Sequence, residues 1–416
     1  MEVIHTKLAQ GNYTLKNVRL ETGFITDENG IAGTQTELFC VEIKGGKIAG
    51  ILPNKEQLAN AIDAKGLLML PAFKDMHIHI DKTLYGLPWQ ALSPKRRTVT
   101  DMIAYEQQII PELLKTSTHR AEMLIGLLQS YGTTFARTHF NVDPTSGTHS
   151  LENLEKALSN KKEMFGAELV AFPQHGLYYT DSASLMKTVA QLQNVDFIGG
   201  LDPFSIDKDI EKVIDFTVEL ALKNNKGIDI HLHDTGKEGM RTIEYLAEKT
   251  MENPQLKGKT YVSHAFALAH LSQPETDKIS EKLAEAKVGI VSSIPFRGKV
   301  MPIPTLARHG VEVLVGNDNV QDYWSTFGSG SMLQKANLIA DLYGWKTEFD
   351  LSRTLRFATK NTLPLSNDGK MQWPKTGDKA ELLLIDASCS AEAVSRMSKT
   401  IAFAHEGNLY WKDNVL

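Results

Sequence analysis

The sequence predicts an α/β protein: a (β/α)8 barrel, or TIM barrel, with a small β-sandwich domain built from both termini. The barrel is predicted by eight short apolar runs rich in β-forming residues, with helical patterns between most of them. The small domain is predicted by strand and turn patterns at both ends of the chain. We therefore expect the β-sandwich in residues 1–66 plus 365–416, and the barrel of a metal-dependent hydrolase in residues 67–364.

The chain ends supply the strands of the small domain. The stretch VEIKGGKIAGILP has two β runs on either side of Gly45 and Gly46, which indicates a hairpin. Near the other end, AELLLIDAS and AFAHEGNLYWKDN indicate strands, with a turn at Gly407 in the second stretch. Because both ends are rich in strands, we expect the termini to meet in one domain.

Eight runs supply the barrel strands, in the order LLMLPAFKDMHIH, TTFARTHF, ELVAFPQHG, VDFIGGLDP, GIDIHLHD, TYVSHA, VGIVSSIP and VEVLVGND. Between them, residues 150–165 and 209–225 carry apolar residues at the three- and four-residue spacing of amphipathic helices, with Ser150 and Asp209 as the expected N-caps. An open doubly wound sheet is the alternative, but the glycine-rich phosphate turn that it would need after its first strand is absent.

The composition excludes several classes of function. The chain has 416 residues, is 42% hydrophobic and carries a formal net charge of −5, so nucleic acid is not an expected partner. We interpret the basic cluster Lys95–Arg97 as a solvated loop. Cys40 and Cys389 form no disulfide pattern, and no signal peptide or membrane-spanning run is present, so we expect a cytoplasmic protein. Barrels of this kind often pair, which makes a homo-oligomer a further expectation.

Polar residues concentrate at the ends of the predicted barrel strands, which is where barrel enzymes carry their active sites. In strand order they are His77, His79, Asp81 and Lys82; Arg137 and His139; Gln174 and His175; Asp202; His231, His233 and Asp234; His264; Asp318 and Asn319. Polar groups that share one barrel mouth need water, partners or a metal ion.

Four of these residues form the expected metal-ligand set. His77 and His79 are two residues apart on a strand and therefore face the same way. His231 adds a third imidazole and Asp318 a carboxylate. Three histidines and one aspartate with an open position suit Zn²⁺ or Fe²⁺ and activate water. Incidental histidines on a half-buried strand are the alternative, which the other strand-end groups disfavour.

As a set, the motifs resemble the amidohydrolase superfamily, and within it the cytosine deaminase-like branch. The matching segments are His77–Asp81, Arg137–Asp143, Phe172–Gly176, His231–Asp234, Ser263–His264 and Asp318–Asn319. The similarity is closest to triazine side-chain hydrolases, which share Lys82, the segment Gly199–Pro203, the segment His231–Gly236 and the segment Asp318–Trp324. The resemblance covers nearly the whole chain.

The resemblance implies a hydrolase that removes ammonia or an alkylamine from a small cyclic amidine or N-heterocycle. It implies the same metal ligands as the strand geometry, and it assigns His264 to the leaving group or the attacking water. Asp234 stands where cytosine deaminases carry a proton-shuttling glutamate. Because aspartate is shorter, His233 is an alternative catalytic residue. Binuclear members carry a bridging lysine on the fourth strand, and VDFIGGLDP has none, so we expect one metal ion.

Four residues are expected to bind the substrate, namely Gln174, Asn319, Lys82 and Asp202. Asn319 replaces an aspartate of the cytosine deaminases, which predicts a different hydrogen-bond pattern in the substrate. The aromatic residues Trp324, Phe327 and Trp89 are candidates to sandwich a flat ring. The alternative function is hydrolysis of a cyclic amide or an N-acyl bond on the same barrel, and release of an amine would separate the two.

Overall fold

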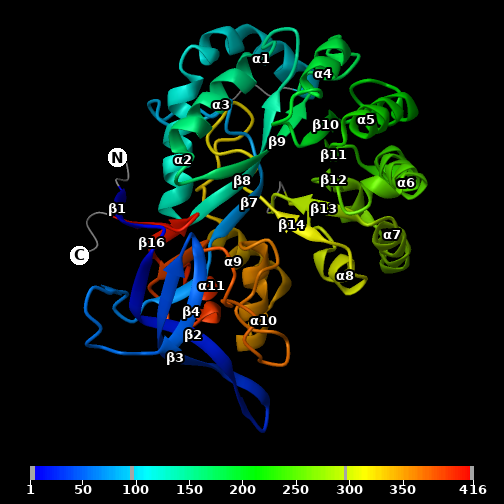
Figure 1. Ribbon diagram of the computed structural model, residues 1–416. Helices are drawn as coiled ribbons and strands as arrows, with labels where there is room; N and C mark the ends of the chain where they lie inside the picture. The colour runs from blue at the N-terminus through cyan, green and yellow to red at the C-terminus, as the bar shows by residue number, and fades with distance from the viewer. Residues whose placement is uncertain (1–4, 94–97, 295–297, 413–416) are drawn as a thin grey trace.

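The computed structural model describes residues 5–93, 98–294 and 298–412, so the basic cluster Lys95–Arg97 lies outside the described residues. Its larger part is a parallel sheet of eight strands in sequence order, enclosed by helices (Figure 1). The strands are β7 (Phe73–Ile78), β8 (Thr133–Asn141), β9 (Gly166–Phe172), β10 (Phe197–Leu201), β11 (Gly227–His231), β12 (Thr260–Ser263), β13 (Val288–Ser292) and β14 (Val313–Val315). Each predicted barrel run overlaps one of these strands, which confirms the predicted fold class.

The barrel closes where its first and last strands meet. Ile78 and Asp318 form a parallel bridge just beyond β14. The backbone nitrogen of Asp318 donates to the His77 carbonyl at 2.7 Å, and the nitrogen of His79 donates to the Asp318 carbonyl at 3.0 Å. The closing seam of the barrel therefore carries three of the four predicted metal ligands.

A glycine permits this close approach. A Cβ atom on Gly316 would overlap the backbone nitrogen and oxygen of His77. We expect Gly316→Ala to destabilise the protein by about 1–3 kcal/mol, because backbone atoms cannot move aside cheaply. Urea unfolding measures the effect. The control Gly126→Ala lies in a helix, where the new Cβ would meet nothing within 4 Å, and should be neutral or stabilising. An unchanged unfolding midpoint for Gly316→Ala would contradict this account of the seam.

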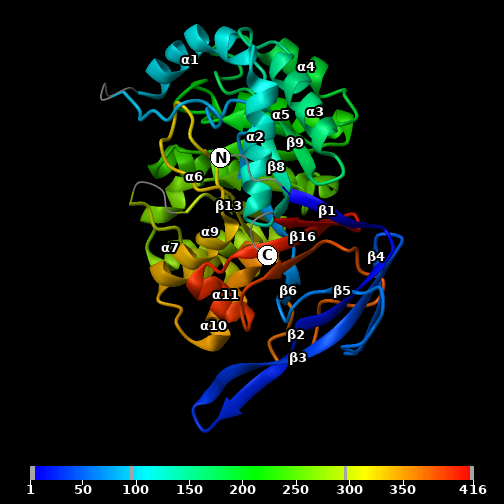
Figure 2. The same cartoon turned by 90° about the vertical axis from the view of Figure 1, so that its left-hand side faces the viewer.

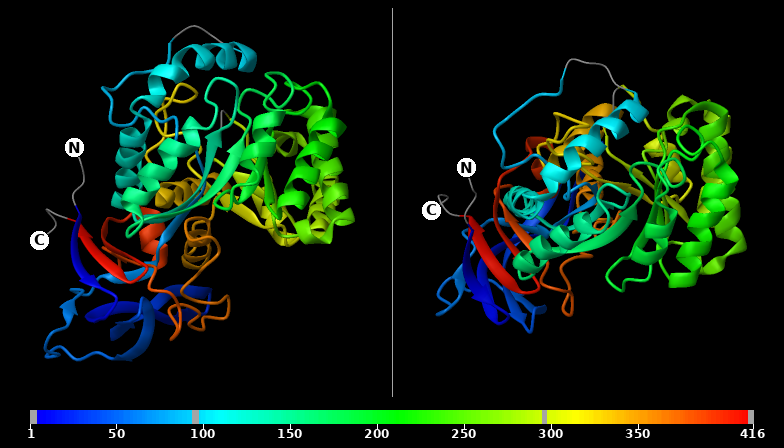
Figure 3. Two further views of the ribbon diagram at one scale, coloured as in Figure 1. Left: turned by 45° about the horizontal axis from the view of Figure 1, so that its top comes forward. Right: turned by 90° about the horizontal axis from the view of Figure 1, so that it is seen from above.

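Helices surround the barrel (Figure 3). They are α1 (Val99–Leu114), α2 (Ser117–Ser130), α3 (His149–Lys161), α4 (Ala183–Val189), α5 (Ile210–Asn224), α6 (Gly236–Glu252), α7 (Gln273–Ala286), α8 (Ile303–Arg308), α9 (Met332–Tyr343) and α10 (Glu348–Thr354), with short 3-10 turns η1 (Pro254–Leu256), η2 (Phe266–His270) and η3 (Leu355–Phe357). Asp209 caps α5 as expected. Ser150 is not an N-cap, because the turn from Asp143 to Gly147 leads the chain into α3 earlier and places Thr148 at the cap position.

Both ends of the chain contribute to a second sheet (Figure 2). Its nine strands are β1 (His5–Gln10), β2 (Tyr13–Asp27), β3 (Gly30–Lys44), β4 (Lys47–Pro53), β5 (Ile62–Asp63), β6 (Leu68–Pro71), β15 (Leu382–Ile385), β16 (Thr400–His405) and β17 (Asn408–Lys412), with α11 (Ser390–Arg396) between β15 and β16. The hairpins at Gly45–Gly46 and at Gly407 are confirmed.

The strand order of this sheet interleaves the two ends of the chain. The order is β1-β17-β16-β15-β6-β2-β3-β4, with β5 beside β2. Strand β6 thus belongs to this sheet, although it lies past residue 66, where the sequence suggested that the domain ends. One core cluster contains residues of early and late strands, such as Leu15, Val41, Leu384 and Trp411. Within the described residues, every helix is too short or too polar to span a lipid bilayer.

Candidate active site

The four predicted metal ligands come together at the carboxyl end of the barrel. His77, His79, His231 and Asp318 are buried, and each offers a ligand atom within 4.8 Å of those of the others. The Nε2 atoms of His79 and His231 lie 3.1 Å apart. Oδ1 of Asp318 lies 3.5 Å from Nε2 of both His77 and His79. These four residues therefore converge on one point.

The protonation states of this cluster fit a divalent cation. Burial lowers the pKa of His79 to about 3, with a further contribution from Lys82. Burial and neighbouring imidazoles lower the pKa of His231 far below its usual value. Burial would raise the pKa of Asp318, but the surrounding histidines hold it well below its usual range. Neutral imidazoles and an ionised carboxylate are the forms that bind a metal ion.

A second group of metal-binding side chains lies deeper in the barrel and consists of His77, His139 and Asp229. Asp229 already accepts hydrogen bonds from Arg137 Nη1 at 3.0 Å and from Ser263 Oγ at 2.6 Å. The guanidinium of Arg137 therefore balances its charge inside the barrel. The residues of β10, FIGGL, include no lysine that could bridge two ions.

The hydroxyl of Ser263 orients His77, the first of the predicted metal ligands. Its Oγ donates to Asp229 and lies 2.9 Å from Nδ1 of His77. Because the hydroxyl hydrogen is directed to Asp229, Oγ of Ser263 accepts a hydrogen bond from the Nδ1–H group of His77. This arrangement assigns the tautomer of His77 in which Nε2, the atom facing Asp318, carries no proton.

Ser263→Ala is expected to lower metal affinity by about 10- to 100-fold, because His77 loses the group that fixes its tautomer. Competition with a chelator measures the affinity directly and needs no substrate. The control Ser395→Ala removes a hydroxyl from an exposed position and should leave metal binding unchanged. Equal affinity in Ser263→Ala and the wild type would show that the tautomer is fixed by other means.

His264 and His233 lie against the metal-ligand cluster. The ring of His264 is centred 4.9 Å from that of His77 and stacks on His233 at 4.6 Å. Its Nδ1 lies 3.1 Å from Oγ of Ser293. Burial lowers the pKa of His264 well below its usual value, so the ring is neutral. The backbones of His264 and Asp318 have φ angles of 68° and 65°, the kind of strained conformation that concentrates at functional sites.

Asp202 orients the segment that carries the two shuttle candidates. Its Oδ2 lies 2.8 Å from Nδ1 of His233, and its Oδ1 accepts from the backbone nitrogens of His233 and Asp234. Burial opposes protonation of His233, but Asp202 raises its pKa above the usual value. Asp234 differs from His233 because its Oδ2 accepts from the backbone nitrogen of Ser205 at 3.2 Å. We expected Asp202 to contact substrate, yet both of its oxygens bond to this segment; substrate contact stays a prediction.

The other predicted substrate-binding residues form two oriented pairs. Nζ of Lys82 donates to Oε1 of Gln174, and Nδ2 of Asn319 donates to Oδ2 of Asp322. Burial raises the pKa of Asp322 to about 7. Nζ of Lys82 lies 5.7 Å from the centre of the Trp324 ring.

Only one of the three aromatic candidates contacts this group. Trp324 is half-buried beside Lys82, whereas Trp89 and Phe327 are 73% and 84% exposed. Asp81 is buried and accepts from the backbone nitrogen of Asn141 at 2.9 Å.

Several buried carboxylates were missed by the sequence analysis, among them Asp229, Asp322 and, on a helix, Glu106. Glu106 lies on α1, a helix beyond the carboxyl ends of the strands (Figure 1), and contacts residues from three strand ends. Glu106 follows none of the predicted strands, so the strand-end pattern does not include it. One feature of the sequence could have identified Glu106. It is an acidic residue on the apolar face of α1, three residues after Ile103 and four residues before Ile110.

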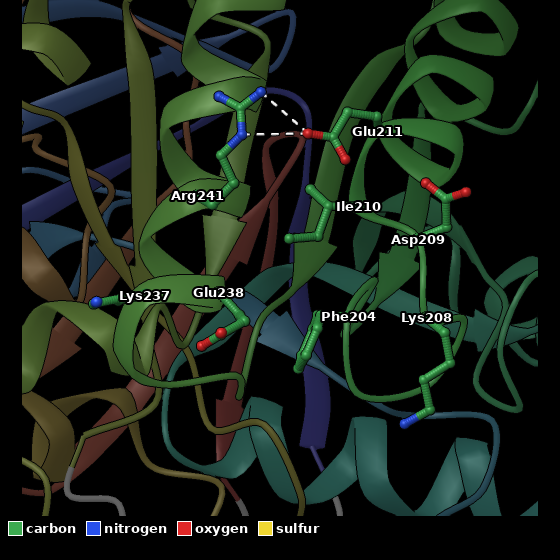
Figure 4. Close-up of a pocket in the computed structure, with 8 residues that line it drawn as sticks. All are labelled: Phe204, Lys208, Asp209, Ile210, Glu211, Lys237, Glu238 and Arg241. Atoms are coloured by element: carbon green, nitrogen blue, oxygen red, sulfur yellow. Dashed lines mark hydrogen bonds and ion pairs between the residues drawn. The ribbon is translucent and has the colours of Figure 1, made fainter.

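A separate surface pocket of about 430 Å³ lies beside α5 and α6 (Figure 4). It is lined by a mixture of acidic and basic side chains and by the apolar residues Phe204 and Ile210. Arg241 and Glu211 form an ion pair of 3.1 Å on its wall. None of the predicted metal ligands lines this pocket.

Comparison with known proteins identifies relatives along most of the chain. The profile of the amidohydrolase family matches residues 60–112 and 128–402. The uncharacterized protein YahJ of Escherichia coli (strain K12) is 46% identical over 410 residues, which are 97% of this chain and 89% of that protein. N-isopropylammelide isopropyl amidohydrolase of Pseudomonas sp. (strain ADP) is 27% identical over 397 residues, covering 93% of this chain and 97% of that protein.

The similarity extends to three dimensions. The crystal structure of N-isopropylammelide isopropylaminohydrolase from Burkholderia multivorans superposes with a TM-score of 0.81 at 26% identity. The match covers 96% of this chain and 98% of that chain, so it includes both the barrel and the terminal sheet. The resemblance that the strand-end motifs predicted is confirmed. The chain belongs to the amidohydrolase family and is a hydrolase of carbon–nitrogen bonds.

Proposed function

We propose that this protein hydrolytically removes ammonia or an alkylamine from a small cyclic amidine or N-heterocycle. The observation that carries the proposal is the convergence of His77, His79, His231 and Asp318 beside the stacked rings of His264 and His233. Support comes from the two N-isopropylammelide hydrolases, which this chain resembles over nearly its whole length.

The cofactor that we propose is one Zn²⁺ or Fe²⁺ ion held by these four ligands. When bound, such an ion makes a neighbouring water acidic enough to act as a nucleophile at neutral pH. A single ion is favoured because Asp229, in the deeper group, is paired with Arg137 and because β10 has no lysine.

We propose that His233 is the residue that donates a proton to the leaving amine. Its ring stacks on His264 and is held by Asp202, whereas the carboxylate of Asp234 bonds to the backbone of Ser205. His264 is a neutral imidazole beside the ligand cluster, and we assign it to holding the attacking water through hydrogen bonding.

The orientation of two side-chain amides predicts what the site recognises. Lys82 is a pure donor, so the oxygen of Gln174 must face it, and the amide NH₂ of Gln174 serves as the donor to substrate. Asn319 directs its NH₂ to Asp322, so its oxygen serves as the acceptor. A ring that offers both an acceptor, such as a carbonyl oxygen, and a donor, such as a ring N–H, matches this pair.

Release of ammonia and alkylamine across a panel of rings tests the proposal. The panel contains cytosine, isocytosine, ammelide, N-alkyl ammelides, pterin and creatinine, with the protein loaded in turn with zinc and with iron. Release from one ring class would support the proposal and name the substrate class. No release by protein with confirmed metal would overturn it in favour of cyclic-amide or N-acyl hydrolysis.

A further inference from the structure

A single carboxylate joins α1 to the end of the barrel where the metal ligands lie. The side chain of Glu106 is 3% exposed. Its Oε1 accepts from Nε1 of Trp324 at 2.8 Å and lies 3.9 Å from Nζ of Lys82. Its Oε2 lies 3.2 Å from Nε2 of His175. Glu106 therefore contacts residues that follow β7, β9 and β14, and it forms an ion pair with Lys82.

Glu106 lies among cations and other carboxyl groups. Lys82 also interacts with the carboxyl groups of Asp81 and Asp322, and burial raises the pKa values of these two groups to about 6 and about 7. Nδ1 of His175 lies 3.3 Å from Oδ1 of Asp143, so the imidazole sits between two carboxylates. Burial would lower the pKa of His175, but these carboxylates raise it to about 9, and the ring is a cation at neutral pH. Burial would raise the pKa of Glu106, but Lys82 and His175 lower it. The cations Lys82 and His175 thus face the anions Glu106 and Asp143.

Lys82 connects this group to the ligand cluster. Its Nζ donates to Gln174 and lies 5.9 Å from the centre of the Phe172 ring. The same Phe172 ring stacks on His231 at a centroid distance of 4.0 Å. The ammonium group and one of the predicted metal ligands therefore lie beside the same aromatic ring.

We propose that Glu106 is a positioning residue that sets the charge selectivity of the site. Lys82 and Gln174 form the side of the proposed substrate site that we call the substrate wall. By pairing with Lys82, Glu106 neutralises the charge of this wall. The site therefore prefers uncharged rings over anionic rings of the same shape. A buried ammonium without this partner would attract an anion strongly, because charges interact more strongly away from bulk water. The inference rests on the proposed function, since it takes Lys82 and Gln174 as the substrate wall.

The variant Glu106→Gln tests this directly, because the amide keeps the size of the side chain and removes its charge. The probes are uracil, which is neutral, and barbiturate, a similar ring that is ionised at neutral pH. Titration calorimetry gives both dissociation constants for protein loaded with the same metal. We expect the affinity ratio of barbiturate to uracil to rise about tenfold or more in the variant. The control Glu112→Gln removes an exposed carboxylate, paired with Lys115, from the same helix and should leave the ratio unchanged.

The reciprocal variant Lys82→Gln keeps the inference testable if Glu106→Gln does not fold. It leaves Glu106 without its ammonium partner, so the ratio should fall below that of the wild type. A ratio that moves in neither variant, in proteins that bind both rings, overturns this inference alone. A wild-type protein that binds neither ring and releases no amine from the panel overturns the proposed function and this inference with it.

Discussion

Replacement of His77 by alanine is expected to abolish turnover and to lower the bound metal. Three observations on His77 support this expectation. It is buried in the four-residue ligand cluster, its Nε2 has no hydrogen-bond partner among the described residues, and its other ring nitrogen is held by Ser263. Removing one of four ligands leaves an incomplete site, and loss of the activated water should slow the reaction by about a thousandfold or more.

Metal analysis of the purified His77→Ala protein, together with amine release, measures both parts of this prediction. The control His149→Ala removes an imidazole that is 67% exposed and pairs with Glu152 near the start of α3. It should keep full metal content and activity. If His77→Ala retained metal at the wild-type level, His77 would have to be removed from the ligand set.

The second large effect is expected from His233→Ala, which should slow the chemical step by about 100- to 10,000-fold while metal stays bound. His233 is not in the ligand cluster, but its ring stacks on that of His264 and is oriented by Asp202. Loss of a positioned proton donor therefore affects kcat rather than metal binding. Single-turnover kinetics on a substrate identified from the panel would measure the chemical step.

Asp234→Asn is the matched comparison, because it changes the neighbouring shuttle candidate. Its carboxylate bonds to the backbone of Ser205, so we expect only a small change in the chemical step. A large loss of activity in Asp234→Asn, with a near-normal rate in His233→Ala, would reverse the assignment. Near-normal rates in both would place proton transfer elsewhere.

The barrel was predictable because the spacing of apolar residues within a short segment is enough to indicate a strand or a helix. Each of the eight strands forms from one short apolar run, and the helices between them, such as α5 with its Asp209 cap, follow their own amphipathic spacing. The position of β6 was not predictable in this way. Whether Leu68–Pro71 joins the barrel or the terminal sheet depends on its pairing with β15, a strand that lies more than 300 residues later.

The metal-ligand residues were predictable for a related reason. Parallel strands in one barrel end on the same face, so a polar residue at a strand end can be placed without knowledge of packing. The orientation of side chains was not predictable. The sequence left His233 and Asp234 as equal candidates, and only their different partners, Asp202 and the backbone of Ser205, distinguish them.

The sequence alone determined the fold class, the family and the four residues that converge on one ligand cluster, because these follow from local periodicity and from motifs at strand ends. The tertiary structure decided which side chains from other segments of the chain contact and orient the residues of the site. Ser263 and Asp229 fix the tautomer of His77 from neighbouring strands, and Glu106 reaches Lys82 from a helix with no motif of its own. Such contacts join residues that are far apart in the chain, so they cannot be predicted from the pattern of residues within one segment. Which charged side chains lie next to one another depends on how the segments pack.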